Sequence, residues 1–226
     1  MKERIAAIEK RLSEACERSG RSRDDITLVA VTKSISDERT AQFVEAGIIH
    51  VGENRTDSMM KKHAAIHQPQ MKWHFIGNLQ SRKVKDIIDI VDVIHSVDRL
   101  SVVKQIDKRA SQPIDCFVQV NVSGEKSKSG LSPDEVQDFI ESLKDYQNVR
   151  VIGLMTMAPY EATEKELRTY FRTMRELRDQ IADQQFAHAP CTELSMGMSN
   201  DFEIAVEEGA TYVRIGTALV GSEKEA

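Results

Sequence analysis

The chain has 226 residues, of which 40% are hydrophobic and 30% are charged, and its 31 Lys and Arg against 36 Asp and Glu give a formal net charge of -5. A chain of this size buries one full core, so we expect a single domain over residues 1–226. The acidic balance argues against nucleic acid or an anionic membrane as a partner, because both carry negative charge.

The amino-terminal segment MKERIAAIEKRLSEACE is charged throughout and has neither the apolar run nor the small-residue cleavage site of a signal peptide. No later stretch approaches the ~20 apolar residues of a membrane span. Cys16, Cys116 and Cys191 are odd in number and far apart, a pattern that fits reduced thiols better than a disulfide framework or a zinc site. We therefore expect a cytoplasmic protein with no membrane span and no metal site.

The first predicted element is an additional helix that precedes the strands. Its apolar residues Ile5, Ile8, Leu12 and Cys16 recur at spacings of three and four, which places them on one helical face. We expect this helix to cover one end of the fold. After the turn-like segment GRSRDD comes ITLVAVT (residues 26–32), a short β-branched run typical of a strand that is buried on both faces.

Further strands follow along the chain, and helical patterns separate most of them. Together with the first, the predicted strands span residues 26–32, 48–51, 72–76, 91–96, 116–122, 151–155, 192–195 and 212–215. The predicted helices span residues 37–46, 55–67, 100–110, 133–143, 165–181 and 201–208. Eight βα units predict a closed (β/α)8 barrel of the TIM type. An open doubly wound sheet is the alternative, but the chain lacks the glycine fingerprint of nucleotide-binding examples of that fold.

The carboxyl ends of the strands carry the candidate functional residues, because the chemistry of such barrels lies where the strands lead into the βα loops. Lys33 directly follows the first strand. A lysine amine at the mouth of a barrel is well placed to form an imine with an aldehyde. Taken alone, a solvated or ion-paired role for Lys33 is the better interpretation.

Two loops at the same end of the predicted barrel have the composition of an anion site. The segments LSMGMSND and RIGTALVG combine glycines with hydroxyl residues directly before helical stretches, after the seventh and eighth strands. Small residues let backbone N–H groups approach an anion. We expect one phosphate pocket, formed by Ser199, Asn200, Gly216 and Thr217. Only the combination of this pocket with Lys33 favours an imine-forming lysine.

Other polar residues, in the predicted strands and in one loop, allow two interpretations each. Alternation puts Arg214 and Gly216 on the face toward the barrel axis. Arg214 either contacts a ligand there or forms a buried pair with Glu53 or another inward carboxylate. His74 is better interpreted as a core histidine than as a catalytic base. The two lysines of GEKSKSGL (residues 124–131) are better explained by a solvated turn than by anion binding.

The chain resembles the pyridoxal phosphate homeostasis proteins, whose fold is similar to the N-terminal barrel of alanine racemase. The resemblance extends over nearly the whole chain. The motifs that carry it are AVTK around Lys33, VGEN at 51–54, WHFIGNLQSRK at 73–83, SVDR at 96–99, QVNVSGEKSKSGL at 119–131, GLMTMAP at 153–159, LSMGMSND, and GATYVRIGTALVG.

This resemblance implies that Lys33 carries pyridoxal 5′-phosphate (PLP) as a Schiff base and that Arg214 faces the pyridine nitrogen. Asn54 and Met155 would line the ring. The residues it places beside the phosphate are Ser199, Asn200, Gly216 and Thr217. Arg82 is a departure, because many relatives have asparagine there.

An arginine at the pyridine nitrogen indicates weak catalysis. A guanidinium offers only donors, so it favours an unprotonated pyridine and weakens the electron sink on which PLP enzymes depend. Alanine racemase-like enzymes also use a tyrosine base from an additional domain, and this chain ends soon after its eighth βα unit. We expect a monomeric PLP carrier that serves vitamin B6 homeostasis and passes PLP to apo-enzymes, with at most weak racemase activity.

Three alternatives stay open from the sequence. The first is a small PLP-dependent amino-acid racemase, and the second is a Schiff-base aldolase that acts on sugar phosphates. The third is a protein-interaction module without a bound small molecule. The first two share the barrel lysine and the phosphate pocket with a PLP carrier.

Overall fold

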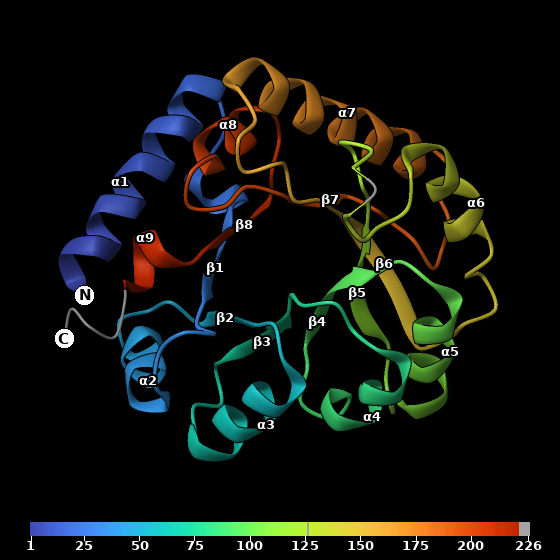
Figure 1. Cartoon of the computed structure of the whole chain (residues 1–226), viewed down its shortest axis with the longest axis horizontal. Helices are drawn as coiled ribbons and strands as arrows, with labels where there is room; N and C mark the ends of the chain where they lie inside the picture. The colour runs from blue at the N-terminus through green and yellow to red at the C-terminus, as the bar shows by residue number, and fades with distance from the viewer. Residues whose placement is uncertain (126, 222–226) are drawn as a thin grey trace.

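A computed structural model describes residues 1–125 and 127–221 of the chain. Its eight strands are parallel and form one closed ring in sequence order, because β1 pairs with β8 as well as with β2 (Figure 1). The strands are β1 (Thr27–Val31), β2 (His50–Glu53), β3 (Lys72–Phe75), β4 (Val93–Val97), β5 (Ile114–Gln119), β6 (Val149–Met155), β7 (Glu193–Ser195) and β8 (Tyr212–Ile215). The predicted (β/α)8 barrel is confirmed, and the open doubly wound sheet is wrong.

Helices surround the ring of strands (Figure 1). They are α1 (Lys2–Ser19), α2 (Asp37–Glu45), α3 (Thr56–Ala65), α4 (Val84–Ile87), α5 (Leu100–Arg109), α6 (Val136–Glu141), α7 (Glu164–Asp183), α8 (Phe202–Glu207) and α9 (Thr217–Val220). Short 3-10 turns lie at Arg23–Asp25, Ser81–Lys83 and Pro133–Glu135. The one-turn helix α4 was not predicted, because a single turn is too short for an apolar period, whereas α9 is the helical stretch expected after the eighth strand. None of the helices within the described ranges has the length and apolar character that crossing a bilayer requires.

The amino-terminal helix α1 lies in the outer ring of helices rather than over an end of the barrel, so that part of the prediction is wrong. It packs against α8 and α9 (Figure 1). Its buried stripe contains Ile8, Leu12 and Cys16, as the sequence spacing predicts. Arg11 adds a bidentate ion pair to Glu203 of α8, with N–O distances of 2.9 and 2.8 Å. The spacing determines the apolar face of this helix, but its docking partner depends on the tertiary structure.

The helix α7 shows how local sequence sets an element's start. Thr163 at its N-cap accepts from the backbone N–H of Glu166, and the Glu166 carboxylate accepts from the backbone N–H of Thr163, a reciprocal capping box. The helix then buries Leu167, Phe171, Met174 and Ile181 at helical spacing. These side chains face strands β6 and β7, against which α7 packs.

Two different layers of side chains pack against the ring of strands, one outside it and one inside it. Between the strands and the helices lies one large apolar core, to which Phe43, Phe171 and Ile94 contribute. Inside the ring of strands lies a smaller cluster, made of Val93, Phe117, Ile152, Met155 and the half-buried Tyr212. Tyr212 and Phe117 both contact the ring of His95, whose centroid is 4.5 Å from that of Phe117. Polar rings therefore share the interior with apolar ones.

Candidate functional site

Strand pairing brings Lys33 and the loop after β8 to the same edge of the barrel. Strand β1 pairs with β8 with Ala30 opposite Ile215, so the residues that follow each strand are neighbours. A Cβ placed on Gly216 would lie 3.7 Å from the Cβ of Val31, two residues before Lys33. Lys33 itself is exposed. The strand ends that carry the two predicted parts of the cofactor site therefore lie at the same mouth.

The loops after β7 and β8 contact each other directly. The backbone N–H of Ala218 donates to Ser199 Oγ at 3.5 Å, which links the two predicted phosphate-binding segments. Gly197, at φ 94, gives the loop after β7 a turn that a side chain would obstruct, since a Cβ there would lie 2.6 Å from the Cβ of Ala205. Within the described residues, the backbone N–H groups of Ser199 and Asn200 donate to no protein acceptor. These N–H groups are available to an anion.

The side chain of Lys33 borders a polar cavity of about 330 Å³ on the α2 and α3 side of the mouth. The lining of this cavity includes Ser36, Asp37, Ser58 and Lys61. It includes none of the four predicted phosphate-binding residues. The amine and the anion loops thus share the mouth of the barrel without sharing this cavity.

A buried ion pair lies directly beneath Lys33. Lys62 Nζ is 2.8 Å from Glu53 Oε1, and the two side chains are 5% and 0% exposed. Lys62 also donates to the carbonyl oxygen of Thr32, and the hydroxyls of Thr32 and Ser58 donate to Glu53 at 2.7 Å each. This network fixes the backbone from which Lys33 projects. Sequence reasoning missed it, because Glu53 and Lys62 meet only when α3 folds back against β2.

Arg214 lies inside the barrel, as predicted, and is 3% exposed. Its Nη1 donates to Ser195 Oγ at 2.5 Å, and its Nη2 donates to the carbonyl oxygen of Thr156 at 2.8 Å. The suggested pair with Glu53 is wrong, because Lys62 is the partner of that carboxylate. Burial lowers the pKa of Arg214 to about 10, against the opposing charge of Asp201. The guanidinium is therefore protonated at neutral pH.

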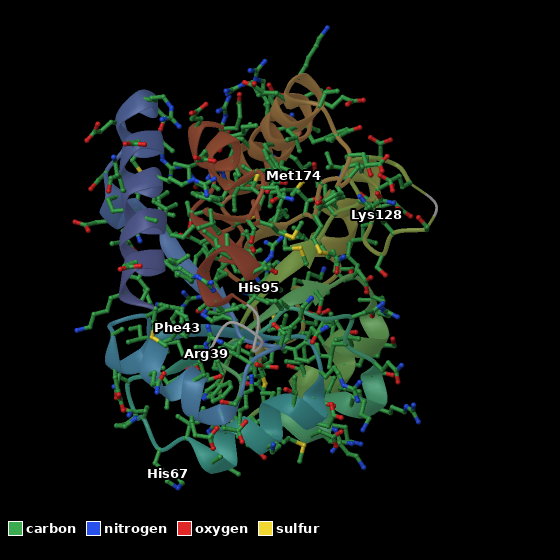
Figure 2. All side chains as sticks on the ribbon, turned by 60° about the vertical axis from the view of Figure 1, so that its left-hand side comes forward. Arg39, Phe43, His67, His95, Lys128 and Met174 are labelled. Atoms are coloured by element: carbon green, nitrogen blue, oxygen red, sulfur yellow. The ribbon has the colours of Figure 1, made fainter. Side chains whose placement is uncertain are left out.

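Three histidines continue the hydrogen bonds of Arg214 through the barrel. His95 Nδ1 is 2.8 Å from Ser195 Oγ, His74 Nδ1 is 2.9 Å from His95 Nε2, and His50 Nδ1 is 2.9 Å from His74 Nε2. We call the line from His50 through His74, His95 and Ser195 to Arg214 the polar column. Figure 2 shows His95 near the middle of the molecule, whereas His67 lies at its edge.

The stagger of the strands builds this column. His74 lies opposite Gly52, two residues beyond His50, and Val93 lies opposite His74, two residues before His95. Each histidine is therefore one inward position closer to the mouth than the previous one. The prediction of His74 as a buried core residue is compatible with this arrangement, but the roles of His50 and His95 were missed. Their inward alternation was the available signal.

Burial keeps the rings of the polar column neutral. Desolvation lowers the pKa of His74 to about 3 and holds the pKa of His95 well below its ordinary value. The pKa of the half-buried His50 is also lowered, mainly by desolvation, with Asp92 opposing this effect and Lys72 adding to it. Although three histidines meet here, no group of three or more His, Cys, Asp or Glu in residues 1–125 and 127–221 is placed to hold a metal ion.

The two residues expected to line the ring of the cofactor have different environments. Met155 is 1% exposed and packs inside the barrel with Phe117. Asn54 is exposed at the mouth. Its carbonyl oxygen would lie only 2.1 Å from a Cβ on Gly77, so the loops after β2 and β3 pack closely only because residue 77 has no side chain.

A second cavity, of about 420 Å³, opens beside the loop after β7. Its lining includes Ile76, Gln119, Lys128 and Met198. Lys128 is paired with Glu125 at 3.2 Å and is thus engaged within its own turn, while Lys126 lies outside the described residues. Arg82, the departure from the family pattern, is exposed and donates to Gln80 Oε1 at 3.0 Å.

Comparisons with known proteins agree with this architecture. Residues 4–224 match the family model for the alanine racemase N-terminal domain. A protein of Aquifex aeolicus (strain VF5), named pyridoxal phosphate homeostasis protein, is 41% identical over 225 residues, which cover 98% of each chain. One of the same name from Escherichia coli (strain K12) is 33% identical over 96% of this chain and 94% of its own. The chain belongs to the pyridoxal phosphate homeostasis protein family.

Solved structures also share the fold of this chain. PipY of Synechococcus elongatus PCC7942, determined with PLP bound, superposes with a TM-score of 0.82 at 32% identity, covering 95% of this chain and 100% of PipY. Alanine racemase from Clostridium difficile 630 superposes with a TM-score of 0.73 at 14% identity, covering 93% of this chain but 54% of the enzyme. The latter similarity concerns the fold alone.

Proposed function

We propose that this chain binds PLP as a Schiff base on Lys33 and acts in the intracellular homeostasis of that cofactor. The observation that carries this proposal is the pairing of β1 with β8, which brings an exposed lysine and the loop at Gly216 to one mouth. The names of the relatives and the PLP-bound structure of PipY support it.

The groups around the mouth fit the chemistry of PLP. A phosphate needs donors, and the free backbone N–H groups of Ser199 and Asn200 lie beside the segment at Gly216 and Thr217. A pyridine nitrogen accepts a hydrogen bond. The guanidinium of Arg214 has five N–H donors. One on Nη1 bonds to Ser195 and one on Nη2 bonds to Thr156, which leaves three others. In this proposal Asn54 and Met155 line the ring.

Arg214 also supports a binding role over a strongly catalytic one. Bound PLP supplies an electron sink, which is strong only when its pyridine nitrogen is protonated. A protonated guanidinium has no acceptor for the N–H of a protonated pyridine and can only donate to the unprotonated nitrogen, so Arg214 holds the ring without strengthening the sink. The proposal therefore includes reversible storage of PLP by a monomeric cytoplasmic protein and its delivery to apo-enzymes, with weak racemase turnover at most.

The attachment site is tested by borohydride reduction of the PLP-loaded protein, followed by intact mass and peptide mapping. We expect one PLP adduct, located at Lys33 and lost in Lys33→Ala. Lys61→Ala is the matched control, because Lys61 is exposed and borders the same cavity. It should retain the full adduct. An adduct that maps to Lys61, or no adduct at all, contradicts the proposal, and rapid turnover of D- or L-alanine contradicts the storage role.

A further inference from the structure

The polar column is an unusual filling for a barrel. Branched apolar side chains normally occupy the interior of a (β/α)8 barrel. Here His74 and His95 are both 0% exposed, Ser195 is 0% exposed and Arg214 is 3% exposed. Buried polar groups are costly unless each finds a hydrogen-bond partner, and here each one contacts the next. Such a line needs an explanation beyond the packing of the barrel.

Arg214, at one end of the line, determines the direction of every hydrogen bond in it. Arg214 can only donate, so Ser195 Oγ accepts from it. Within the described residues the Ser195 hydroxyl contacts only Arg214 and His95, so its single hydrogen points to His95 Nδ1. A ring nitrogen that accepts carries no proton, and neutral His95 therefore holds its proton on Nε2.

The same reasoning passes along the remaining rings. His95 Nε2–H donates to His74 Nδ1, so His74 also carries its proton on Nε2. His74 Nε2–H then donates to Nδ1 of the half-buried His50, which is left with its proton on Nε2 as well. The pKa values, lowered by burial, agree with three neutral rings. Every donor in the column thus points away from Arg214, toward the amino ends of the strands.

We propose that Ser195, His95, His74 and His50 are positioning residues for Arg214, and that they form a one-way hydrogen-bond chain which presents its guanidinium to the bound ligand. Ser195 and Thr156 hold two guanidinium nitrogens, which sets the plane of the group and directs its remaining donors. The histidines keep Ser195 in its accepting orientation, because they take its only proton. The positioning of Arg214 for PLP rests on the proposed function, whereas the direction of the hydrogen bonds in the polar column does not.

The direction of the hydrogen bonds in the polar column is tested in the protein without PLP. Long-range ¹⁵N–¹H NMR reports which ring nitrogen carries the proton. At neutral pH we expect His50, His74 and His95 to be neutral and protonated on Nε2, with signals assigned by single substitutions. The exposed His67 serves as an internal reference for a ring outside the polar column. A proton on Nδ1 of His74 or His95, or a charged ring at either position, overturns the proposal.

The positioning role is tested with Ser195→Ala, Ser195→Thr and Ser96→Ala. Ser96 is a matched control, because its buried hydroxyl lies next to His95 in sequence and has no hydrogen-bond partner within the described part of the chain. We expect Ser195→Ala to weaken PLP binding roughly tenfold, as for loss of one hydrogen bond to a charged group. It should also shift the absorption bands of bound PLP. Ser195→Thr should restore both, and Ser96→Ala should change neither.

The possible results separate the two proposals. If the wild-type protein takes up no PLP, the proposed function fails. The histidine tautomers measured without PLP still show whether the hydrogen bonds of the polar column run in the proposed direction. If folded Ser195→Ala, checked by circular dichroism, binds PLP with the affinity and spectrum of wild type, the positioning role is wrong. Should Ser195→Ala fail to fold, His50→Leu at the half-buried end carries the same test, because it removes the acceptor of His74 Nε2–H. It should shift the His74 Nε2 signal and the PLP spectrum, and an unchanged PLP spectrum overturns the positioning role.

Discussion

The two sides of the strands differ in what fills them. Outside the strands, apolar side chains from helices and strands interlock in one core, whereas inside them the polar column crosses among a few apolar groups. The outer core contributes to stability in proportion to its buried area. A buried polar line contributes little net stability, since well-packed apolar residues often replace such groups without loss. The outer side therefore maintains the fold, and the inner side is the one shaped by the site.

The largest expected effect comes from the outer side. Phe171 of α7 is 0% exposed, and Phe171→Ala should lower the free energy of unfolding by roughly 3–5 kcal/mol, through lost burial and the cavity left behind. Urea unfolding followed by circular dichroism measures the change. Phe171→Leu, which leaves a smaller cavity, is the control and should cost clearly less. PLP attachment in the folded fraction should be unchanged, and loss of attachment in both variants would blur the distinction between the two sides.

The next largest effect concerns the ion pair beneath Lys33. Lys62→Met leaves Glu53 buried with only hydroxyl partners, and should cost about 3 kcal/mol in urea unfolding. The double variant Glu53→Met with Lys62→Met removes both charges and should recover part of that loss. Since Lys62 also holds the carbonyl of Thr32, PLP attachment at Lys33 should slow in both variants. Equal stability of Lys62→Met and wild type contradicts this prediction.

Acid should destabilise the protein through the inner side. The pKa of His74 is about 3 in the folded protein and about 6.5 when unfolded, so the unfolded state binds more protons between these values. As far as His74 is concerned, the free energy of unfolding is therefore highest above pH ~6.5. It falls as the pH drops toward 3, by up to ~1.4 kcal/mol per pH unit for each such histidine. His95 adds to this slope, since its pKa is also lowered.

The comparison for the acid effect is His74→Phe, which keeps a ring but cannot take a proton. It should flatten the dependence of stability on pH between 6.5 and 3, whatever its stability at neutral pH. The charged or titratable groups that face the rings are Lys72, Asp92, Arg214 and Tyr212. An unchanged slope in His74→Phe would show that other groups carry the acid sensitivity.

The difference between the two sides also explains what the sequence predicts. Strand and helix periods are local, so the apolar run before Lys33 and the stripe of α7 indicate their elements directly. The mouth residues followed from the rule that loops after parallel strands meet at one end, and the contact of Ala218 with Ser199 agrees with that rule.

Contacts that depend on the offset between strands could not be predicted in this way. His50 and His74 are 24 residues apart, and His74 and His95 are 21 apart. Alternation shows that each side chain points inward, but only the stagger of the closed ring brings one ring next to another. The same limit applies to Glu53 and Lys62, and to the docking of α1 against α8.

The smallest expected effect lies at the start of α7, on the outer side. Thr163→Ala removes the hydroxyl that caps the helix and should cost about 1 kcal/mol in urea unfolding, whereas Thr163→Ser keeps the hydroxyl and should cost much less. Within the described residues Thr163 hydrogen-bonds only to Glu166 and Leu167 and not to the polar column, so the ring tautomers and the PLP spectrum should be those of wild type. A shift in either would mean that the helices around the barrel also set the order of the groups inside it.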